Sequence, residues 1–404
     1  MDIIDPDKEI IALEGGIPVR ATRLPYGLQY VNDEDIEAVT QVLRSDWITT
    51  GPKVEEFEEA TSRYVGAKYA VSFSSGTAAL HGAAYAAKLG SDDEVITTPL
   101  TFCATANSAL YVGAKPVFAD VSEDTLNIDP KNIHQKITSR TKAIIPIDYA
   151  GHPAEIDTIM ALAEEFELTV IEDASHAIGS EYKSRRIGGL SHMTVFSFHP
   201  VKHITTGEGG MVTTDNPEFA NRLRKFRNHG INRNFENQPD KAEKQWYYEM
   251  DDLGFNYRLS DISCALGLSQ LKRLPENISR RRDIVSKYNS EISKITGLIT
   301  PTERVDNRSA WHIYPLRFDL AKFKVGRTSI FRALRAENIH VNVHYVPVHL
   351  HPYYRTKFGF RGGEYPVAES NYERLITLPL FPTMTDQDVE DVLSAVNKIC
   401  RHFT

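Results

Sequence analysis

The sequence contains very few cysteines, and their spacing excludes a disulfide framework. Cys103, Cys264 and Cys400 are the three cysteines among 404 residues, and they lie far apart in the chain. An odd number of distant thiols is typical of proteins from a reducing compartment. The opening segment, MDIIDPDKEIIALEGG, is acidic and lacks the basic and apolar regions of a signal peptide. We therefore expect a cytoplasmic protein.

Long apolar runs and an excess of basic charge are also missing. No uncharged apolar segment approaches the roughly 20 residues that a membrane-spanning helix needs. The formal net charge is −8, whereas phosphate backbones are bound by basic surfaces. We therefore expect neither a membrane nor a nucleic acid as a partner.

Two nucleotide-binding motifs are absent as well. The sequence has no G-x-G-x-x-G and no G-x-x-x-x-G-K-[ST] segment. This excludes the usual dinucleotide fingerprint and the P-loop.

What the sequence does contain is an alternation of β-branched runs and helical segments between about Val65 and Thr214. Strands are expected in KYAVSFSS, EVITTP, KPVFADV, KAIIPIDYAG, LTVIEDASHA, TVFSFH and GGMVTT, and a helix is expected to begin at Gly76. Strands separated by helices of this length predict βαβ units and a mainly parallel sheet, which is an α/β fold.

The rest of the chain predicts a second, smaller unit. A long helical pattern covers residues 259–292, and we expect Pro275 to break it. Beyond it, WHIYPLRFDL and HVNVHYVP are expected strands, and residues 328–337 and 386–401 are expected helices. We predict a large α/β domain with an N-terminal arm at residues 1–270, and a small α+β domain at residues 271–404.

Several polar residues and one aromatic residue follow the expected strands of the sheet. In an open parallel sheet, ligands bind at the carboxyl ends of the strands, so we expect these side chains to meet. They are Ser75, Gly76, Thr77, Thr101, Phe102, Asp173, Ser197 and Lys202.

The segment SSGTAAL, residues 74–80, predicts a strand-to-helix turn. Its backbone N–H groups and the positive end of the helix dipole suit a phosphate. Ser and Thr also cap helices for structural reasons. The turn alone leaves both interpretations open.

Lys202 stands in FSFHPVKHITTGEGGMVTT, between two expected strands. Lysine is usually a solvated surface residue, but a sheltered lysine lowers its pKa and forms a Schiff base with an aldehyde. Asp173 and His176 follow another strand. Asp173 either caps a helix or holds a heterocyclic N–H⁺, and His176 either makes a structural hydrogen bond or acts on a substrate. Together, a lysine, a carboxylate and a phosphate turn are the groups that pyridoxal phosphate requires.

The ordered motifs also carry a resemblance to a known family. SSGTAAL, PLTF, EDASHAIGSEY, SFHPVKHITTGEGG and NYRLSD are similar, in this order, to the DegT/DnrJ/EryC1/StrS sugar aminotransferases. The similarity extends from LPYGLQYVNDEDIEAV to PTMTDQDVEDVL, nearly the whole chain. It implies a fold type I enzyme that depends on pyridoxal 5′-phosphate, with a mainly parallel central sheet and a smaller α+β C-terminal domain.

The resemblance also implies roles for individual residues. Lys202 would carry the cofactor, Asp173 would pair with its ring nitrogen, and His176 would lie beside the ring. From its residue type, Phe102 either offers the ring a flat apolar face or belongs to the core. Gly76, Thr77 and Ser197 would hold the phosphate. The active unit would be a homodimer with shared active sites, in which Asn256 reaches across from the partner subunit.

Four further segments resemble a narrower group, the enzymes that aminate C4 of UDP-linked 4-keto-6-deoxy-N-acetylhexosamines in the pseudaminic acid pathway. These segments are LPYGLQ, SDWITTGP, SHAIGSEY and VNVHYVPVHLHPYY. By this similarity the nucleotide sugar would contact Tyr26, Trp47, Thr49, His344 and Tyr345. His203 departs from the group, whose members often carry proline at that position.

His344, His349 and His351 are close in sequence, but no carboxylate-supported ligand set accompanies them, so we expect no metal.

The implied reaction is a ping-pong transamination with glutamate as the amino donor. Lys202 would act as general base and acid, and Asp173 would keep the ring nitrogen protonated. Three alternatives remain: an aminotransferase for another 4-keto sugar of the perosamine type, a dehydratase of the same family, and a regulator without catalysis. The dehydratases carry histidine in place of the lysine, so Lys202 argues against them.

Overall fold

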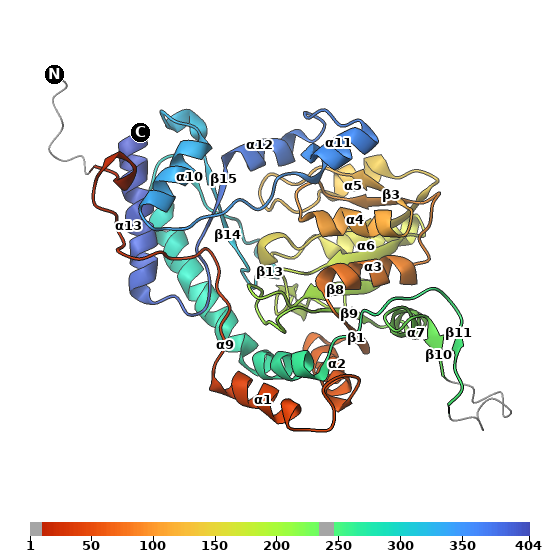
Figure 1. The fold of residues 1–404 in the computed structure, drawn as a ribbon. Helices are drawn as coiled ribbons and strands as arrows, with labels where there is room; N and C mark the ends of the chain where they lie inside the picture. Colours follow the sequence, from red (N-terminus) through yellow and green to blue (C-terminus); the bar gives the residue numbers. More distant parts are fainter. Residues whose placement is uncertain (1–9, 234–245) are drawn as a thin grey trace, which may run out of the picture.

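The computed structural model describes residues 10–233 and 246–404 of the chain. A twisted sheet covered by helices occupies one side of the molecule, and a smaller group of helices and strands built mainly from C-terminal residues occupies the other (Figure 1).

The central sheet has seven strands in the order β1-β9-β8-β5-β4-β2-β3. Its strands are β1 (Tyr69–Phe73), β2 (Glu94–Thr97), β3 (Lys115–Phe118), β4 (Thr141–Ile145), β5 (Thr169–Asp173), β8 (Met193–Ser197) and β9 (Gly210–Thr214). Neighbouring strands from β3 to β8 are parallel, and β9 runs antiparallel to both β8 and β1. The predicted α/β fold with a mainly parallel sheet is confirmed.

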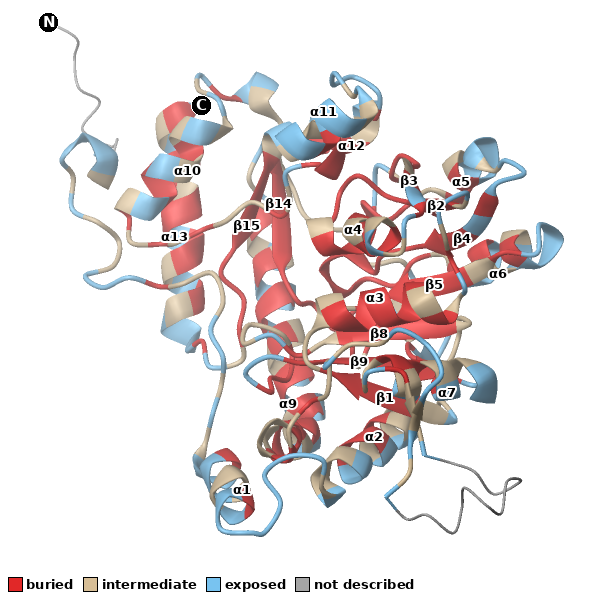
Figure 2. Cartoon of the chain, turned by 45° about the vertical axis from the view of Figure 1, so that its right-hand side comes forward, coloured by how far each residue is buried: buried red, intermediate tan, exposed pale blue. Residues whose placement is uncertain are grey.

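Both faces of the sheet are buried, because successive side chains of each strand point to opposite layers. In β5, for example, Val170 packs with α2, α5 and α6, whereas Ile171 packs with α3, α4 and α7. Figure 2 shows the strands of this sheet and α3 as buried. The helices of these layers are α2 (Pro52–Val65), α3 (Gly76–Ala86), α4 (Cys103–Tyr111), α5 (Pro130–Lys136), α6 (Ile156–Glu165) and α7 (Pro217–Phe226).

The remaining elements lie outside this sheet. The helices are α1 (Asp33–Leu43), α9 (Asp261–Ile292), α10 (Arg327–Ala336), α11 (Pro352–Phe358), α12 (Pro366–Arg374) and α13 (Asp386–Phe403). The short strands are β6 (Glu181–Tyr182), β7 (Arg185–Arg186), β10 (Ile231–Asn232), β11 (Glu249–Met250), β12 (Leu298–Ile299), β13 (Asn307–Arg308), β14 (Tyr314–Phe318) and β15 (Leu375–Leu378). Within the described ranges, no helix has the length and apolar character needed to cross a membrane.

Helix α9 is continuous, so the predicted break at Pro275 is wrong. Pro275 is exposed, so it lies on the solvent side of the helix. Packing of α9 against α1, α2 and α13 outweighs the local cost of the proline. The proposed domain boundary at residues 270/271 falls inside this helix, and the division into two domains stays a proposal.

The C-terminal part forms its own core. Strand β14 lies between β12 and β15 in an antiparallel sheet, and apolar side chains of α9, α10 and α13 pack with this sheet. The segment HVNVHYVP is not a strand, contrary to the prediction. Its residue Asn342 pairs with Thr377, whereas Val348 just beyond it donates its N–H to the Pro99 carbonyl of the large sheet side. The backbone here binds first β15 and then the segment after β2, so it does not form the continuous hydrogen-bond ladder of a strand.

The N-terminal segment, called the N-terminal arm below, comprises residues 10–32. It runs along the C-terminal part before reaching α1 (Figure 1). The Glu337 carboxylate accepts the backbone N–H groups of Ala12 and Val19, each at 2.8 Å. Leu24 pairs with Ile339, and the carbonyl of Tyr26 accepts the N–H of Leu380 at 3.0 Å. These contacts place Tyr26 at the boundary between the two parts of the chain.

Candidate active site

The residues that end the sheet strands line one cavity of about 530 Å³. Most of the predicted site residues contribute to it, namely Tyr26, Gly76, Thr77, Phe102, Asp173, His176, Ser197, Lys202, His344 and Tyr345. The cavity therefore combines the N-terminal arm, the sheet edge and the irregular segment before Val348.

The turn after β8 places Lys202 in the wall of this cavity. Its backbone N–H donates to the His199 carbonyl at 2.9 Å, which closes a tight turn. Burial lowers the pKa of the Lys202 amine to about 8, and the nearby Asp173 carboxylate partly opposes this effect. A lysine in this state has a substantial neutral fraction near neutral pH and can act as a nucleophile and a base.

Asp173 ends β5 and is almost completely buried, with 4% of its surface exposed. One carboxylate oxygen accepts the Thr105 hydroxyl at 2.7 Å, and the other accepts the Ser175 hydroxyl at 2.6 Å. The two hydroxyl donors fix the orientation of the carboxylate and satisfy both of its oxygens. Asp173 thus presents a carboxylate of fixed orientation on the cavity wall.

His176 lies one turn beyond Asp173 and is also buried. Its Nε2 is 3.0 Å from the Tyr345 hydroxyl. Burial, reinforced by the positive charge of Lys202, lowers the pKa of His176 well below its ordinary value. The imidazole is therefore neutral, and it lines the cavity.

The turn before α3 has the geometry of an anion cradle. The Ser75 side chain caps α3 by accepting the N–H of Ala78 at 3.0 Å. A Cβ on Gly76 would lie 3.0 Å from the Ser197 Cβ and 3.1 Å from its Oγ. The absence of a side chain at Gly76 therefore allows the Ser197 hydroxyl to approach the helix N-terminus.

This close approach makes a testable prediction. We expect Gly76→Ala to weaken the binding of pyridoxal phosphate to the apoenzyme at least about tenfold, because Ser197 must move away from the turn. Fluorescence titration of the apoenzyme measures the dissociation constant. Gly90→Ala is the matched control, since a Cβ at Gly90 meets no atom within 4 Å. Equal affinities of Gly76→Ala and the unaltered protein would contradict the cradle.

Sequence reasoning missed several residues of the site. Thr105 and Ser175 hold Asp173, and the His312 Nε2 lies 3.4 Å from the Lys202 amine. His312 stands just before β14, far away in sequence, and no local motif marks it. Thr105 lies on α4, and no motif in its local sequence indicates a place in the site.

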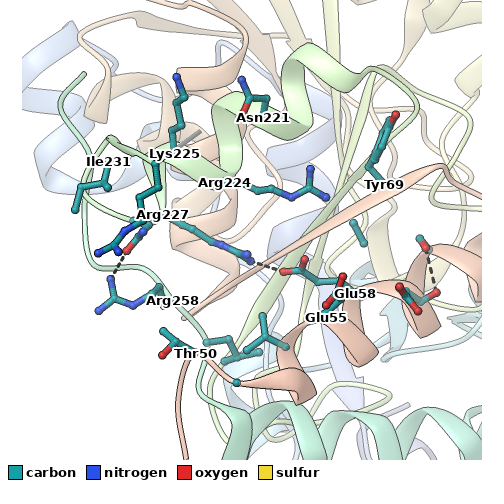
Figure 3. A pocket seen from close by; sticks show the side chains of 18 of the residues that line it. Thr50, Glu55, Glu58, Tyr69, Asn221, Arg224, Lys225, Arg227, Ile231 and Arg258 are labelled. Carbon is teal, nitrogen blue, oxygen red and sulfur yellow. Dashed lines mark hydrogen bonds and ion pairs between the residues drawn. The ribbon is translucent and has the colours of Figure 1, made fainter. Parts of the chain in front are cut away.

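Three predicted site residues lie outside this cavity. Trp47, Thr49 and Asn256 are exposed. Asn256 pairs through its backbone with Asn228, which lines a second cavity of about 740 Å³. Figure 3 shows this second cavity, with the basic side chains Arg224, Lys225, Arg227 and Arg258 along it.

Two arginines that could clamp a substrate carboxylate, Arg258 and Arg317, do not line the active-site cavity. Arg258 donates to the Asn228 side chain at 2.6 Å and lies in the second cavity. Arg317 is buried and donates to the Glu123 carbonyl and the Asn371 side chain. Among the described residues that line the active-site cavity there is no arginine.

The three clustered histidines separate in the structure. His344 lines the active-site cavity, and His351 precedes α11. His349 pairs with Glu369 at 2.9 Å, and a ligand atom of Glu364 lies within 4.8 Å of both. The Glu369 oxygens accept the backbone N–H groups of Gly363 and Tyr365. We therefore interpret the His349–Glu369 pair as a structural contact that stabilises the loop before α12.

Comparisons with known proteins agree with this arrangement. The sequence profile of the DegT/DnrJ/EryC1/StrS aminotransferase family matches residues 29–397. The chain is 45% identical to the spore coat polysaccharide biosynthesis protein SpsC of Bacillus subtilis over 379 residues, which cover 94% of this chain and 97% of that protein. It is 47% identical to an uncharacterized protein of Methanocaldococcus jannaschii over 381 residues, covering 94% of this chain and 98% of the relative.

Solved structures show the same likeness. PseC of Helicobacter pylori, an aminotransferase involved in pseudaminic acid biosynthesis, superposes with a TM-score of 0.88 at 33% identity, covering 95% of this chain and all of PseC. A sugar aminotransferase of Streptococcus pneumoniae, Spr1654, has a TM-score of 0.86 at 30% identity in its pyridoxal-phosphate form, covering 94% of this chain and 99% of Spr1654. Fold, site and comparisons together define a pyridoxal-phosphate-dependent sugar aminotransferase. The chain belongs to the DegT/DnrJ/EryC1/StrS aminotransferase family.

The cavity of this chain fits the cofactor of the family. It contains an amine with a lowered pKa, a buried carboxylate held by two hydroxyls, and a helix N-terminus beside Ser197. These groups suit an aldehyde, a ring nitrogen and a phosphate respectively.

Proposed function

We propose that this enzyme transfers an amino group from glutamate to C4 of a UDP-linked 4-keto-6-deoxy-N-acetylhexosamine, as UDP-4-amino-4,6-dideoxy-N-acetyl-β-L-altrosamine transaminases do. The similarity to PseC over nearly the whole of both chains carries this proposal. The cavity supports it, because Tyr26 and the pair His344–Tyr345 reach the site from opposite ends of the chain. A site assembled from separate segments accommodates a large ligand such as a nucleotide sugar.

In the proposed mechanism, Lys202 would hold pyridoxal phosphate through its amine, and Asp173 would hold the proton at the ring nitrogen. The Gly76–Thr77 turn with Ser197 would hold the phosphate. The cofactor would supply an aldehyde and a ring that accepts the electron pair of the substrate carbon. The Lys202 amine would act as base and acid, taking a proton from the donor Cα and delivering one at C4 of the sugar.

We further propose that the active unit is a homodimer in the cytoplasm. Asn256, Trp47 and Thr49 are exposed and outside the cavity of their own chain, which fits a contribution to the site of a second copy. Exposed apolar side chains in the same N-terminal region, Leu43 and Ile48, would be covered by such a partner. The three cysteines are free, as expected of a reducing compartment.

The substrate proposal is tested by comparing amino acceptors. With glutamate as donor, we expect kcat/KM for a UDP-4-keto-6-deoxy-N-acetylhexosamine to exceed that for oxaloacetate or pyruvate at least about a thousandfold, because a small keto acid leaves most of the site unfilled. A GDP-linked 4-keto sugar serves as the matched comparison for the nucleotide. A preference for the GDP sugar would change the proposed nucleotide from uridine to guanosine. A preference for the small keto acids would overturn the substrate class.

A further inference from the structure

Four buried histidines lie near the amine of Lys202, and the proposed mechanism assigns a step to none of them. They are His176, His203, His312 and His344. The ring of His312 lies between those of His176 and His203, with centroid distances of 4.4 Å and 5.6 Å. Of the four, His312 has the ring nitrogen that is within hydrogen-bond distance of the Lys202 amine, at 3.4 Å.

The backbone of His312 is fixed on both sides. Its N–H donates to the Ala150 carbonyl at 2.9 Å, and its carbonyl accepts from the Arg281 guanidinium at 3.1 Å. His312 itself has 5% of its surface exposed. The imidazole therefore has little freedom to turn away from Lys202.

The surroundings also keep His312 neutral. The charged and titratable groups that face it are Lys202, His176, His203 and Arg281. Burial, followed by the positive charge of Lys202, lowers the pKa of His312 well below its ordinary value. The His203 Nε2 lies 3.0 Å from the Ala310 carbonyl, which only accepts, so His203 donates there and is not directed at the amine.

We propose that His312 is the positioning residue of Lys202: its neutral imidazole accepts a hydrogen bond from the amine through Nε2, which orients the amine and stabilises its protonated form. The inference rests on the proposed role of Lys202. It assigns to His312 a function in setting the protonation of the base, distinct from any contact with the substrate.

The reason for such a partner is physical. Burial lowers the pKa of Lys202, and the charge of the Asp173 carboxylate partly raises it again. Asp173 is already engaged by Thr105 and Ser175. An acceptor for the ammonium raises the pKa again, because hydrogen bonding to a charged form favours that form.

The test measures the covalent uptake of pyridoxal phosphate by the apoenzyme as a function of pH. The uptake rate follows the neutral fraction of Lys202, so in the unaltered protein we expect a midpoint near the pKa of about 8. His312→Phe removes the acceptor, and we expect the midpoint to fall by about one pH unit, so that uptake at pH 6 becomes about tenfold faster.

Two further variants distinguish the loss of the hydrogen-bond acceptor from the change in the shape of the side chain. His312→Gln places an oxygen near the position of Nε2 and should restore the midpoint, whereas His312→Asn is polar but too short and should behave like His312→Phe. His203→Gln is the matched control, since it keeps a donor for Ala310 and should leave the midpoint unchanged. If His312→Phe does not fold, the comparison of His312→Gln with His312→Asn decides.

Equal midpoints in the unaltered protein, His312→Phe and His312→Asn would overturn the inference, and so would equal shifts in His312→Gln and His312→Asn. Failure of the proposed role of Lys202 gives a different result, because Lys202→Ala would then still take up the cofactor covalently.

Discussion

Lys202→Ala is expected to abolish transamination, with kcat reduced at least about ten-thousandfold, because one amine serves as both the covalent anchor and the proton carrier. The variant should also lose the yellow colour and the borohydride-sensitive attachment of the cofactor. The fold should persist, since the Lys202 side chain faces a cavity and packs into no apolar cluster.

The matched control is Lys183→Ala. Lys183 is exposed and pairs with Asp157 far from the cavity, so kcat should stay within a factor of about two, as for most exposed ion pairs. Absorbance spectra and single-turnover kinetics measure both properties. A Lys202→Ala protein that transaminates at a near-normal rate would refute the assignment.

A mixed dimer should recover activity that neither parent possesses. Lys202→Ala lacks the amine and Asn256→Ala lacks the side chain proposed to act in the partner site. Each heterodimer would contain one site with both residues intact. After random exchange of equal amounts of the two proteins, we expect about one quarter of the unaltered activity, because half of the dimers are mixed and each has one of two sites restored.

Activity should rise in step with subunit exchange, which differently tagged subunits report independently. As a control, Lys202→Ala mixed with Asp173→Ala should recover no activity. Both residues line the cavity of one chain, so each site of this heterodimer lacks one of them. For Asn256→Ala and Lys202→Ala the intact site arises only if Asn256 crosses the interface; full exchange without the quarter recovery would place Asn256 elsewhere.

The sheet and its ligand edge could be predicted because their determinants are local. Ser75 and Gly76 mark a strand end and a helix start in a few residues, and the alternation of strand and helix lengths fixes the parallel topology. Asp173 and Lys202 follow apolar strands, so the carboxyl edge of the sheet brings them into one cavity.

Other features of the fold and the site could not be predicted from the sequence, because they depend on tertiary packing. His312 lies beside Lys202 because the segment before β14 binds the backbone of Ala150, and the local sequence gives no sign of this contact. Pro275 predicts a break on local grounds, but α9 buries its opposite face along three helices. The segment at residues 340–347 has the composition of a strand, yet its hydrogen bonds go to two separate partners.

The attachment of the N-terminal arm has a consequence for how the protein matures during synthesis. Leu380 holds Tyr26, and Glu337 holds Ala12 and Val19, so these early residues are fixed by residues that are made late. Contacts so distant in sequence form slowly, because a long loop must close before they stabilise anything. The sheet can assemble while the ribosome is still elongating the chain, but the cavity is completed only near the end of translation. Capture of the cofactor is therefore a late event, and a nascent chain that stops before residue 380 would have the lysine without a closed site around it.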